Sequence, residues 1–316
     1  MTIKQYFDLY ICSCAPDGAL VRVSVDKKTG EITKTGEFKL AYPMYAIKAD
    51  EKLLVITRTG GDGDNGALYK YAIGGDGNLT RIGEKLDTGG VVPCHLDALG
   101  EDIYVVNYLS GNIKRMGGGL VKHEGRGPNP VRQEAAHTHC VKITPDGHVL
   151  VTDLGLDTVF VYTRELELLS YAKVPAGYGV RHLVFSEDNK YLYAINELKS
   201  SVSVFEYDGA LKLLNTYPAA PELDGNTGAA IRLLGDRLYA SNRGHDSVAV
   251  FKIDGAGLVF EKYLSTFGKE PRDFDVFGRF LVCTNQRSDS VTVIDRETGA
   301  LLSEITVKEP LCVTEI

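Results

Sequence analysis

Tryptophan is absent from this 316-residue sequence, methionine occurs only three times, and no apolar run approaches the length of a membrane-spanning helix. The missing tryptophan excludes the propellers that carry a Trp-Asp dipeptide in each repeat. Positive charge is also scarce, because 35 lysines and arginines face 42 aspartates and glutamates, which gives a net charge of −7. Such a charge does not suit non-specific binding to nucleic acid. The chain does not begin with the basic, apolar and small residues of a secretory leader, so we expect a cytoplasmic protein without a membrane partner.

The chain has only six cysteines, and five of them lie inside apolar, strand-like stretches. A domain of this size does not need disulfides, because 44% of its residues are hydrophobic and can form a core. Cys12 and Cys14 alternate onto one face of a strand and lack partners at the spacing of zinc ligands. We therefore expect reduced cysteines in the core.

The sequence does contain a repeat, marked by short apolar segments at intervals of roughly 40 to 50 residues. A polar pair, a turn and another apolar strand follow, as in Ser201–Phe205, Ser247–Phe251 and Ser290–Ile294, and a more variable fourth strand comes next. Four strands in such a period are typical of a β-propeller blade. We predict an all-β, seven-bladed propeller with four antiparallel strands per blade, formed by residues 1–316 as one domain. The seven segments are Leu9–Cys12, Leu53–Ile56, Ile103–Val106, Val149–Thr152, Leu192–Ile195, Leu238–Ser241 and Phe280–Cys283.

The two ends of the sequence complement each other. The chain begins on a second-strand pattern at Phe7–Cys12, whereas Pro310–Ile316 copies the first-strand pattern of Pro43–Ile47. We expect the C-terminal segment to supply the innermost strand of a blade whose outer strands come from the N-terminus. This pairing would remove the open edges of the sheet.

The segment Tyr178–Glu197 shows how one repeat could support chemistry. Two apolar strands flank the turn Ser186–Lys190, which predicts a β-hairpin. Arg181 and His182 open the first strand and Glu197 follows the second, so the hairpin brings all three to the same end of the sheet. A buried carboxylate beside arginine and imidazole has a tunable pKa, which suits acid–base catalysis.

The other repeats place further polar residues at the same mouth of the channel. His95 and His139 align with His182 at first-strand openings, and Arg272 aligns with Arg181. Arg58 and Arg243 follow second strands, as Glu197 does, and His137 lies two residues before His139. The predicted catalytic residues are His139, Arg181 and Glu197, and the predicted substrate-binding residues are His95, His137, His182, Arg243, Arg272 and Arg58.

Some of these residues also admit a plainer interpretation. His182 could cap its own strand, and the recurrent Asn or Asp at second-strand ends could hydrogen-bond the turn and hold the blade in shape. His137 and His139 could bind a metal with His95, but no carboxylate ligand is evident and we expect no metal. The glycine-rich segment Met116–Ala136 interrupts the repeat, which is typical of a functional loop. The recurrent Asn and Asp residues are Asn107, Asp153, Asn242 and Asn285.

The whole chain resembles the seven-bladed propeller lactonases, most specifically at Gly125–Gly155, Gly179–Leu198 and Leu238–Phe251. That family includes propeller-type 6-phosphogluconolactonases and the fungal carboxy-cis,cis-muconate lactonising enzyme. Val180 departs from the family pattern, which often has proline at this position. The resemblance adds Arg243 to the site, and it implies that the family's catalytic histidine, arginine and glutamate are His139 (or His137), Arg181 and Glu197.

From these residues we expect the hydrolysis of a small anionic sugar lactone, with 6-phosphogluconolactone favoured and no cofactor. Glu197 or His139 would activate a water molecule, and Arg181 would stabilise the developing oxyanion. Phosphate or carboxylate would be held by Arg243, Arg272 or Arg58. Two alternatives stay open, a lactonising cyclase that acts on a carboxymuconate-like diacid and a non-catalytic binding propeller. The small-molecule substrate is the expected partner of a monomer or weak homodimer.

Overall fold

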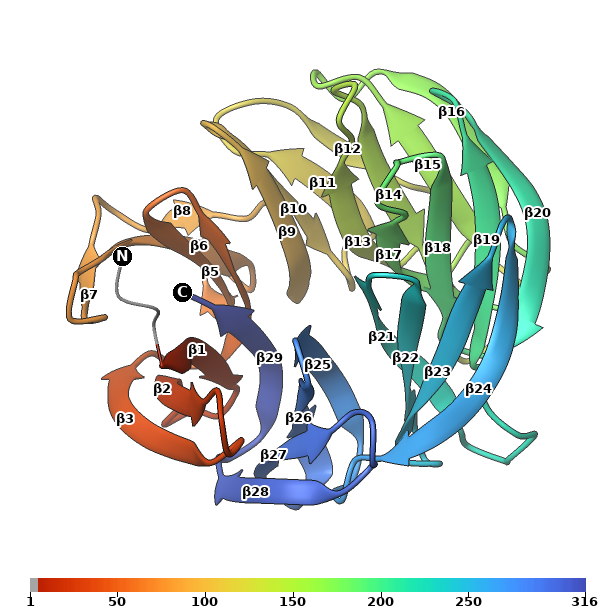
Figure 1. Cartoon of the computed structure of the whole chain (residues 1–316). Coiled ribbons are helices and arrows are strands. Elements are labelled where there is room, and N and C mark those ends of the chain that lie inside the picture. Colours follow the sequence, from red (N-terminus) through yellow and green to blue (C-terminus); the bar gives the residue numbers. More distant parts are fainter. Residues whose placement is uncertain (1–4) are drawn as a thin grey trace.

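A computed structural model describes residues 5–316, which form seven antiparallel β-sheets arranged around a central axis (Figure 1). Each sheet has four strands in sequence order from the axis outward, apart from one short extra strand in the second sheet and the closing strand of the first. The helical content of these residues is one three-residue 3-10 helix, η1 (Gln286–Ser288). None of the helices in this part of the chain is long and apolar enough to cross a membrane. The predicted seven-bladed propeller is confirmed.

The bounds of the strands follow the repeat, and all seven apolar segments lie on second strands. Blades 1 to 4 contain β29 (Pro310–Glu315), β1 (Tyr6–Ser13), β2 (Ala19–Asp26) and β3 (Ile32–Lys39); β4 (Pro43–Ala49), β5 (Lys52–Gly60), β6 (Gly66–Ile73), β7 (Leu79–Arg81) and β8 (Leu86–Asp87); β9 (Pro93–Leu99), β10 (Asp102–Asn107), β11 (Asn112–Arg115) and β12 (Leu120–Lys122); β13 (Thr138–Ile143), β14 (Val149–Asp153), β15 (Thr158–Tyr162) and β16 (Leu168–Lys173). Blades 5 to 7 contain β17 (Val180–Phe185), β18 (Tyr191–Asn196), β19 (Ser201–Tyr207) and β20 (Leu211–Pro218); β21 (Thr227–Leu234), β22 (Arg237–Arg243), β23 (Ser247–Asp254) and β24 (Gly257–Ser265); β25 (Pro271–Phe277), β26 (Phe280–Asn285), β27 (Ser290–Asp295) and β28 (Leu301–Thr306).

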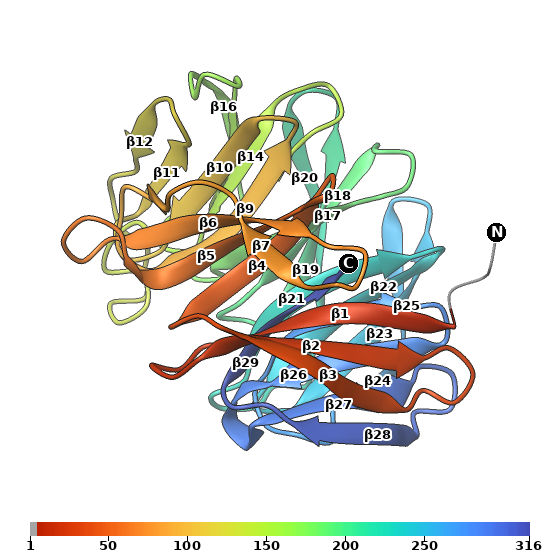
Figure 2. The ribbon, with the colours of Figure 1, turned by 90° about the vertical axis from the view of Figure 1, so that its left-hand side faces the viewer.

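The ring closes as the sequence predicts. Strand β29, from the C-terminal end of the chain, pairs antiparallel with β1 and places Cys312 opposite Cys12. Figure 2 shows β29 running along the blade that β1, β2 and β3 complete. The closing blade therefore joins residues that are about 300 positions apart in the sequence, a contact that only the complete ring can satisfy.

The core lies between neighbouring blades. Side chains alternate across each strand, so every blade presents an apolar face to the next one. Tyr193 and Ile195 of blade 5, for example, pack with Ile231 and Phe251 of blade 6 in one buried cluster. All six cysteines are buried and unpaired, which confirms the expectation of reduced core cysteines.

A β-bulge near the start of each innermost strand corrects one detail of the sequence alignment. In blade 5, Val180 pairs with Asn196 and His182 with Ile195, which leaves Arg181 as the extra residue. In blade 4, the extra residue is His139, because Thr138 pairs with Asp153 and Cys140 with Thr152. His139 is therefore equivalent to Arg181, and not to His182 as the alignment predicted. A bulge turns its extra residue out of the normal alternation.

Candidate active site

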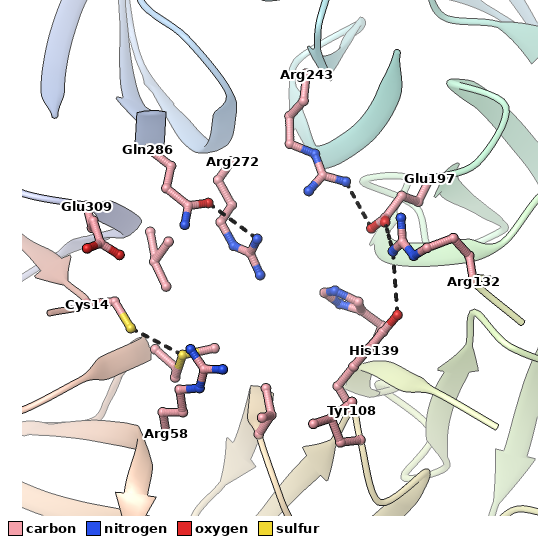
Figure 3. A pocket seen from close by; sticks show the side chains of 14 residues that line it. Cys14, Arg58, Tyr108, Arg132, His139, Glu197, Arg243, Arg272, Gln286 and Glu309 are labelled. Atoms are coloured by element: carbon pink, nitrogen blue, oxygen red, sulfur yellow. Dashed lines mark hydrogen bonds and ion pairs between the residues drawn. The ribbon is translucent and has the colours of Figure 1, made fainter. Parts of the chain in front are cut away.

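A cavity of about 420 Å³ opens at the mouth of the channel where the innermost strands begin (Figure 3). Its volume suits a small-molecule ligand. Bulge residues of the innermost strands form part of the wall, and one long insertion reaches it from the side. Six of the seven blades contribute the residue that directly follows the polar residue near the end of the second strand. These residues are Cys14, Arg58, Tyr108, Glu197, Arg243 and Gln286.

The polar residues just before these positions brace the blades. Asn107 Nδ2 donates to the carbonyl of Thr88 at 2.9 Å, and Asn242 Nδ2 donates to the carbonyl of Ala219 at 2.8 Å. Asp153 Oδ1 accepts a hydrogen bond from the backbone amide of His137 at 2.8 Å. These side chains are fully buried, so the plainer interpretation of the recurrent Asn and Asp residues is confirmed for them.

Glu197 is the buried carboxylate of the cavity, and three arginines surround it. Arg181 Nε donates to Oε2 at 2.9 Å, Arg243 Nη2 lies 3.0 Å from the same oxygen, and Arg132 Nη2 donates to Oε1. Burial alone would raise the pKa of Glu197, but Arg243, Arg181 and Arg132 together hold it well below its usual range. Glu197 is therefore ionised at neutral pH, with its lone pairs committed to guanidinium groups.

Arg181 makes the predicted ion pair, but it lies beneath the cavity and is only 2% exposed. Its Nη1 donates to the carbonyl of Ala229 at 2.5 Å and lies 3.2 Å from His182 Nε2. The side chain does not line the main cavity, whereas Arg132 and Arg243 do. Arg181 thus holds Glu197 from the channel side.

His139 lines the cavity close to Glu197 and Tyr108 (Figure 3). Its Nδ1 is buried and has no hydrogen-bond partner among residues 5–316. Burial and the positive charge of Arg181 lower the pKa of His139 well below its ordinary value, although the negative charge of Glu197 acts in the opposite direction. The imidazole is neutral at pH 7, so it can accept a proton.

Arg58 and Arg272 line the side of the cavity away from Glu197 (Figure 3). Within residues 5–316 neither arginine forms an ion pair with a carboxylate. Arg272 Nη1 has one polar contact, at 3.4 Å from Oε1 of Gln286. Two guanidinium groups that lack a carboxylate partner favour an anionic ligand on this side.

The three other predicted histidines lie outside the main cavity. The ring of His137 stacks on Tyr108 at a centroid distance of 4.4 Å, and its Nε2 lies 3.1 Å from Glu134. His95 and His182 line a second cavity, of about 330 Å³, towards the far ends of the innermost strands. His95, His137 and His139 therefore do not converge on one point. The part of the chain that the structure describes contains no group of three or more His, Cys, Asp and Glu side chains placed to hold a metal.

Sequence reasoning missed Arg132, which lies in the insertion between β12 and β13, residues 123–137. Loop residues follow no periodicity, and the one available signal was that this long segment leads into His137 and His139. It also missed the buried His123, whose Nδ1 lies 2.7 Å from Asp153 and whose Nε2 lies 2.8 Å from the hydroxyl of Tyr162. This pair of contacts ties the start of the insertion to blade 4.

Three buried imidazoles predict a pH-dependent stability. Burial lowers the pKa values of His95, His139 and His182, with nearby cations acting in the same direction. As the pH falls below about 6.5, these histidines take up protons in the unfolded chain while they remain neutral in the fold. The stability that their neutral forms allow is therefore fully present above that pH and is lost progressively below it. We expect the free energy of unfolding to fall by about 1.4 kcal/mol per pH unit for each imidazole.

Chemical denaturation between pH 7.5 and 5.5 measures this slope, because carboxylates titrate mainly at lower pH. His182→Phe, which keeps an aromatic ring, should reduce the slope by about one imidazole's share. A free energy of unfolding that stays constant from pH 7.5 to 5.5 would show that these histidines are charged in the fold or exposed.

Known proteins resemble the chain over most of its length. The family described as "Lactonase, 7-bladed beta-propeller" matches residues 8–315. The 6-phosphogluconolactonase of Bacillus subtilis (strain 168) is 32% identical over 308 residues, which is 87% of each chain. A Bacteroides fragilis structure described as a candidate 6-phosphogluconolactonase has a TM-score of 0.91 and 28% identity, covering 100% of this chain and 99% of that one. The periplasmic gluconolactonase of Pseudomonas aeruginosa has a TM-score of 0.86 and 27% identity, covering 98% and 99%.

The family match and the relatives, together with the polar cavity, identify an enzyme that opens lactone rings. They do not support the alternative of a non-catalytic binding propeller. The chain belongs to the seven-bladed β-propeller lactonase family.

Proposed function

We propose that this lactonase hydrolyses a phosphorylated sugar lactone, with 6-phosphogluconolactone as the first candidate. The observation that carries the proposal is the charge of the main cavity. Its wall contains four arginines, Arg58, Arg132, Arg243 and Arg272, but only two carboxylates, Glu197 and Glu309. A surplus of positive charge favours an anionic substrate. The name of the B. subtilis relative supports the same substrate.

The two sides of the cavity suggest an orientation for the substrate. Arg58 and Arg272 would bind the phosphate, because their guanidinium groups have no carboxylate partner in residues 5–316. The lactone ring would then lie towards His139 and Glu197 on the other side (Figure 3). This arrangement uses the binding of a remote anion to position the reacting carbonyl.

His139 is the general base in this proposal. Its imidazole is neutral and faces the cavity, whereas Glu197 is saturated by Arg132, Arg181 and Arg243. His139 would take a proton from water as the water oxygen bonds to the lactone carbonyl carbon. The ring C–O bond then breaks, and the imidazolium returns its proton to the departing ring oxygen, which becomes a hydroxyl. The new carboxylic acid ionises and releases one proton to solvent.

Glu197 and Arg181 support this base without taking part in proton transfer. The carboxylate lies beside the imidazole and lowers the energy of the imidazolium that forms during the reaction, as its effect on the pKa of His139 indicates. Arg181 keeps that carboxylate in place from beneath the cavity. Both are positioning residues in this proposal, and metal-independent catalysis by these groups is part of it.

A turnover assay with three compounds, two lactones and one diacid, tests the proposed function. We expect 6-phosphogluconolactone to be hydrolysed faster than unphosphorylated gluconolactone, as measured by kcat/KM after subtraction of spontaneous hydrolysis. A carboxymuconate-like diacid tests the alternative of a lactonising cyclase. Preferential turnover of the unphosphorylated lactone or of the diacid would contradict the proposed substrate.

The phosphate subsite gives a separate prediction. Arg58→Gln and Arg272→Gln should each lower kcat/KM for 6-phosphogluconolactone by roughly 10- to 100-fold, since a hydrogen bond to a charged group contributes about 1.5–3 kcal/mol. Turnover of gluconolactone by the same variants is the control, and we expect it to change only a few-fold. Equal losses for both substrates would place the phosphate elsewhere.

A further inference from the structure

The insertion between β12 and β13 has a defined fold that presents one side chain to the cavity. Asn129 Oδ1 accepts hydrogen bonds from the backbone amides of Val131 and Arg132, each at 3.1 Å. Gln133 is fully buried, and its Nε2 donates to the carbonyl of Leu154 at 2.9 Å. Gly127 fits closely against this turn, because an added Cβ would come within 2.7 Å of Gln133 Cδ. Arg132 lies in this turn, directly before Gln133.

Arg132 uses only part of its guanidinium group in contacts with the protein. Its Nη2 donates to Glu197 Oε1 and lies 3.5 Å from the hydroxyl of Tyr108. The Nε and Nη1 hydrogens make no hydrogen bond within residues 5–316. The side chain is 39% exposed and lines the cavity, in contrast to Arg181, which is almost fully buried beneath Glu197. Arg132 therefore has N–H donors available for a ligand.

Arg132 also lies on the side of the cavity that holds the proposed base. Its contact with Tyr108 places it next to a ring whose centroid is 5.7 Å from that of His139. Arg243 Nη2 contacts Glu197 at 3.0 Å and the carbonyl of Gly228 at 3.2 Å, whereas its Nε has no hydrogen-bond partner within residues 5–316. Arg243 is less available than Arg132 because this Nε is buried and only 8% of the residue is exposed. Among the three arginines around Glu197, Arg132 is the most exposed one with free donors, and it lies on the His139 side of the cavity.

We propose that Arg132, and not Arg181, is the catalytic residue that donates hydrogen bonds to the oxyanion. This inference rests on the proposed function. When the water oxygen bonds to the lactone carbonyl carbon, the carbonyl π electrons move to its oxygen, and Nε or Nη1 of Arg132 stabilises that charge. The electrons return as the ring C–O bond breaks, and the proton balance through His139 is unchanged. One edge of the planar guanidinium holds Glu197 while another faces the substrate.

This role predicts a specific kinetic defect. Arg132→Gln should lower kcat for 6-phosphogluconolactone by roughly 10²–10³-fold, as expected for the loss of one oxyanion donor. KM should change little, because Arg58 and Arg272 hold the phosphate. Arg132→Lys should recover only part of the loss, since a point charge cannot contact Glu197 and the oxyanion together. Guanidinium ion added at millimolar concentration should partly restore kcat of Arg132→Ala, a rescue that a purely structural role would not give.

Arg126→Gln is the matched control, because Arg126 is exposed on the same insertion and does not line the main cavity. It should retain the wild-type kcat. If the wild-type protein and this control hydrolyse the lactone and Arg132→Gln does so equally fast, the role of Arg132 is wrong while the proposed function stands. A rise in KM alone would make Arg132 a binding residue and would also overturn the inference. If neither the wild-type protein nor the control hydrolyses any lactone, the proposed function itself fails and the role of Arg132 fails with it.

Discussion

Replacing His139 with glutamine is expected to lower kcat on the hydrolysed lactone by roughly 10²–10⁴-fold, the range for losing a general base. The amide keeps a polar group of similar size but cannot accept a proton at neutral pH. Because burial and Arg181 lower the pKa of His139, the acid limb of the wild-type kcat/KM profile should lie below pH 6.5. The measurement is steady-state kinetics from pH 5 to 8, with thermal unfolding of the variant to show that it is folded.

His148→Gln is the control for this experiment. His148 lies away from the cavity and contacts the hydroxyl of Tyr207 at 3.0 Å, so its loss should leave kcat unchanged. A His139→Gln variant with near-wild-type kcat would transfer the role of base to Glu197, the other candidate. In that case Glu197→Gln should abolish the reaction, and the acid limb of the wild-type kcat/KM profile should report the pKa of a carboxylate.

Deleting residues 310–316 is expected to prevent stable folding. Strand β29 contributes Leu311, Cys312 and Val313, which are at most 5% exposed and belong to three different core clusters. Burying Leu311 and Val313 alone stabilises the fold by about 1.5–3 kcal/mol each, which is a large part of the whole stability of a typical protein. The deletion also leaves β1 as an unpaired edge. We expect the deletion variant to show no cooperative thermal transition and to associate in size-exclusion chromatography.

A rearranged chain distinguishes ring closure from a simple requirement for these seven residues. Ile316 donates its backbone N–H to the carbonyl of Asp8 at 3.0 Å, so the end of β29 lies close to the start of β1. Placing residues 310–316 ahead of residue 1 should let the same strand form a hairpin with β1 and restore most of the melting temperature. A deletion variant that melts within a degree or two of the full chain would contradict this account.

The sequence alone determined the architecture, because a propeller is a local pattern repeated. Each blade is encoded by the apolar and polar residues that alternate along its own strands, so seven apolar segments predicted seven blades. The first-strand motif that is repeated from Pro310 onward predicted the closure of the ring. The hairpin Tyr178–Glu197 likewise predicted the contact between Arg181 and Glu197, since its geometry depends on one turn and two strands.

The tertiary structure decided which side chains share the cavity. A bulge shifts the register by one residue without a mark in the sequence, so His139 faces the main cavity while His95 and His182 face the second one. Arg132 could not be found from periodicity, because its place depends on Asn129 and Gln133 folding the insertion against blade 4. Register and loop packing depend on contacts between distant residues, and no repeat in the sequence records them.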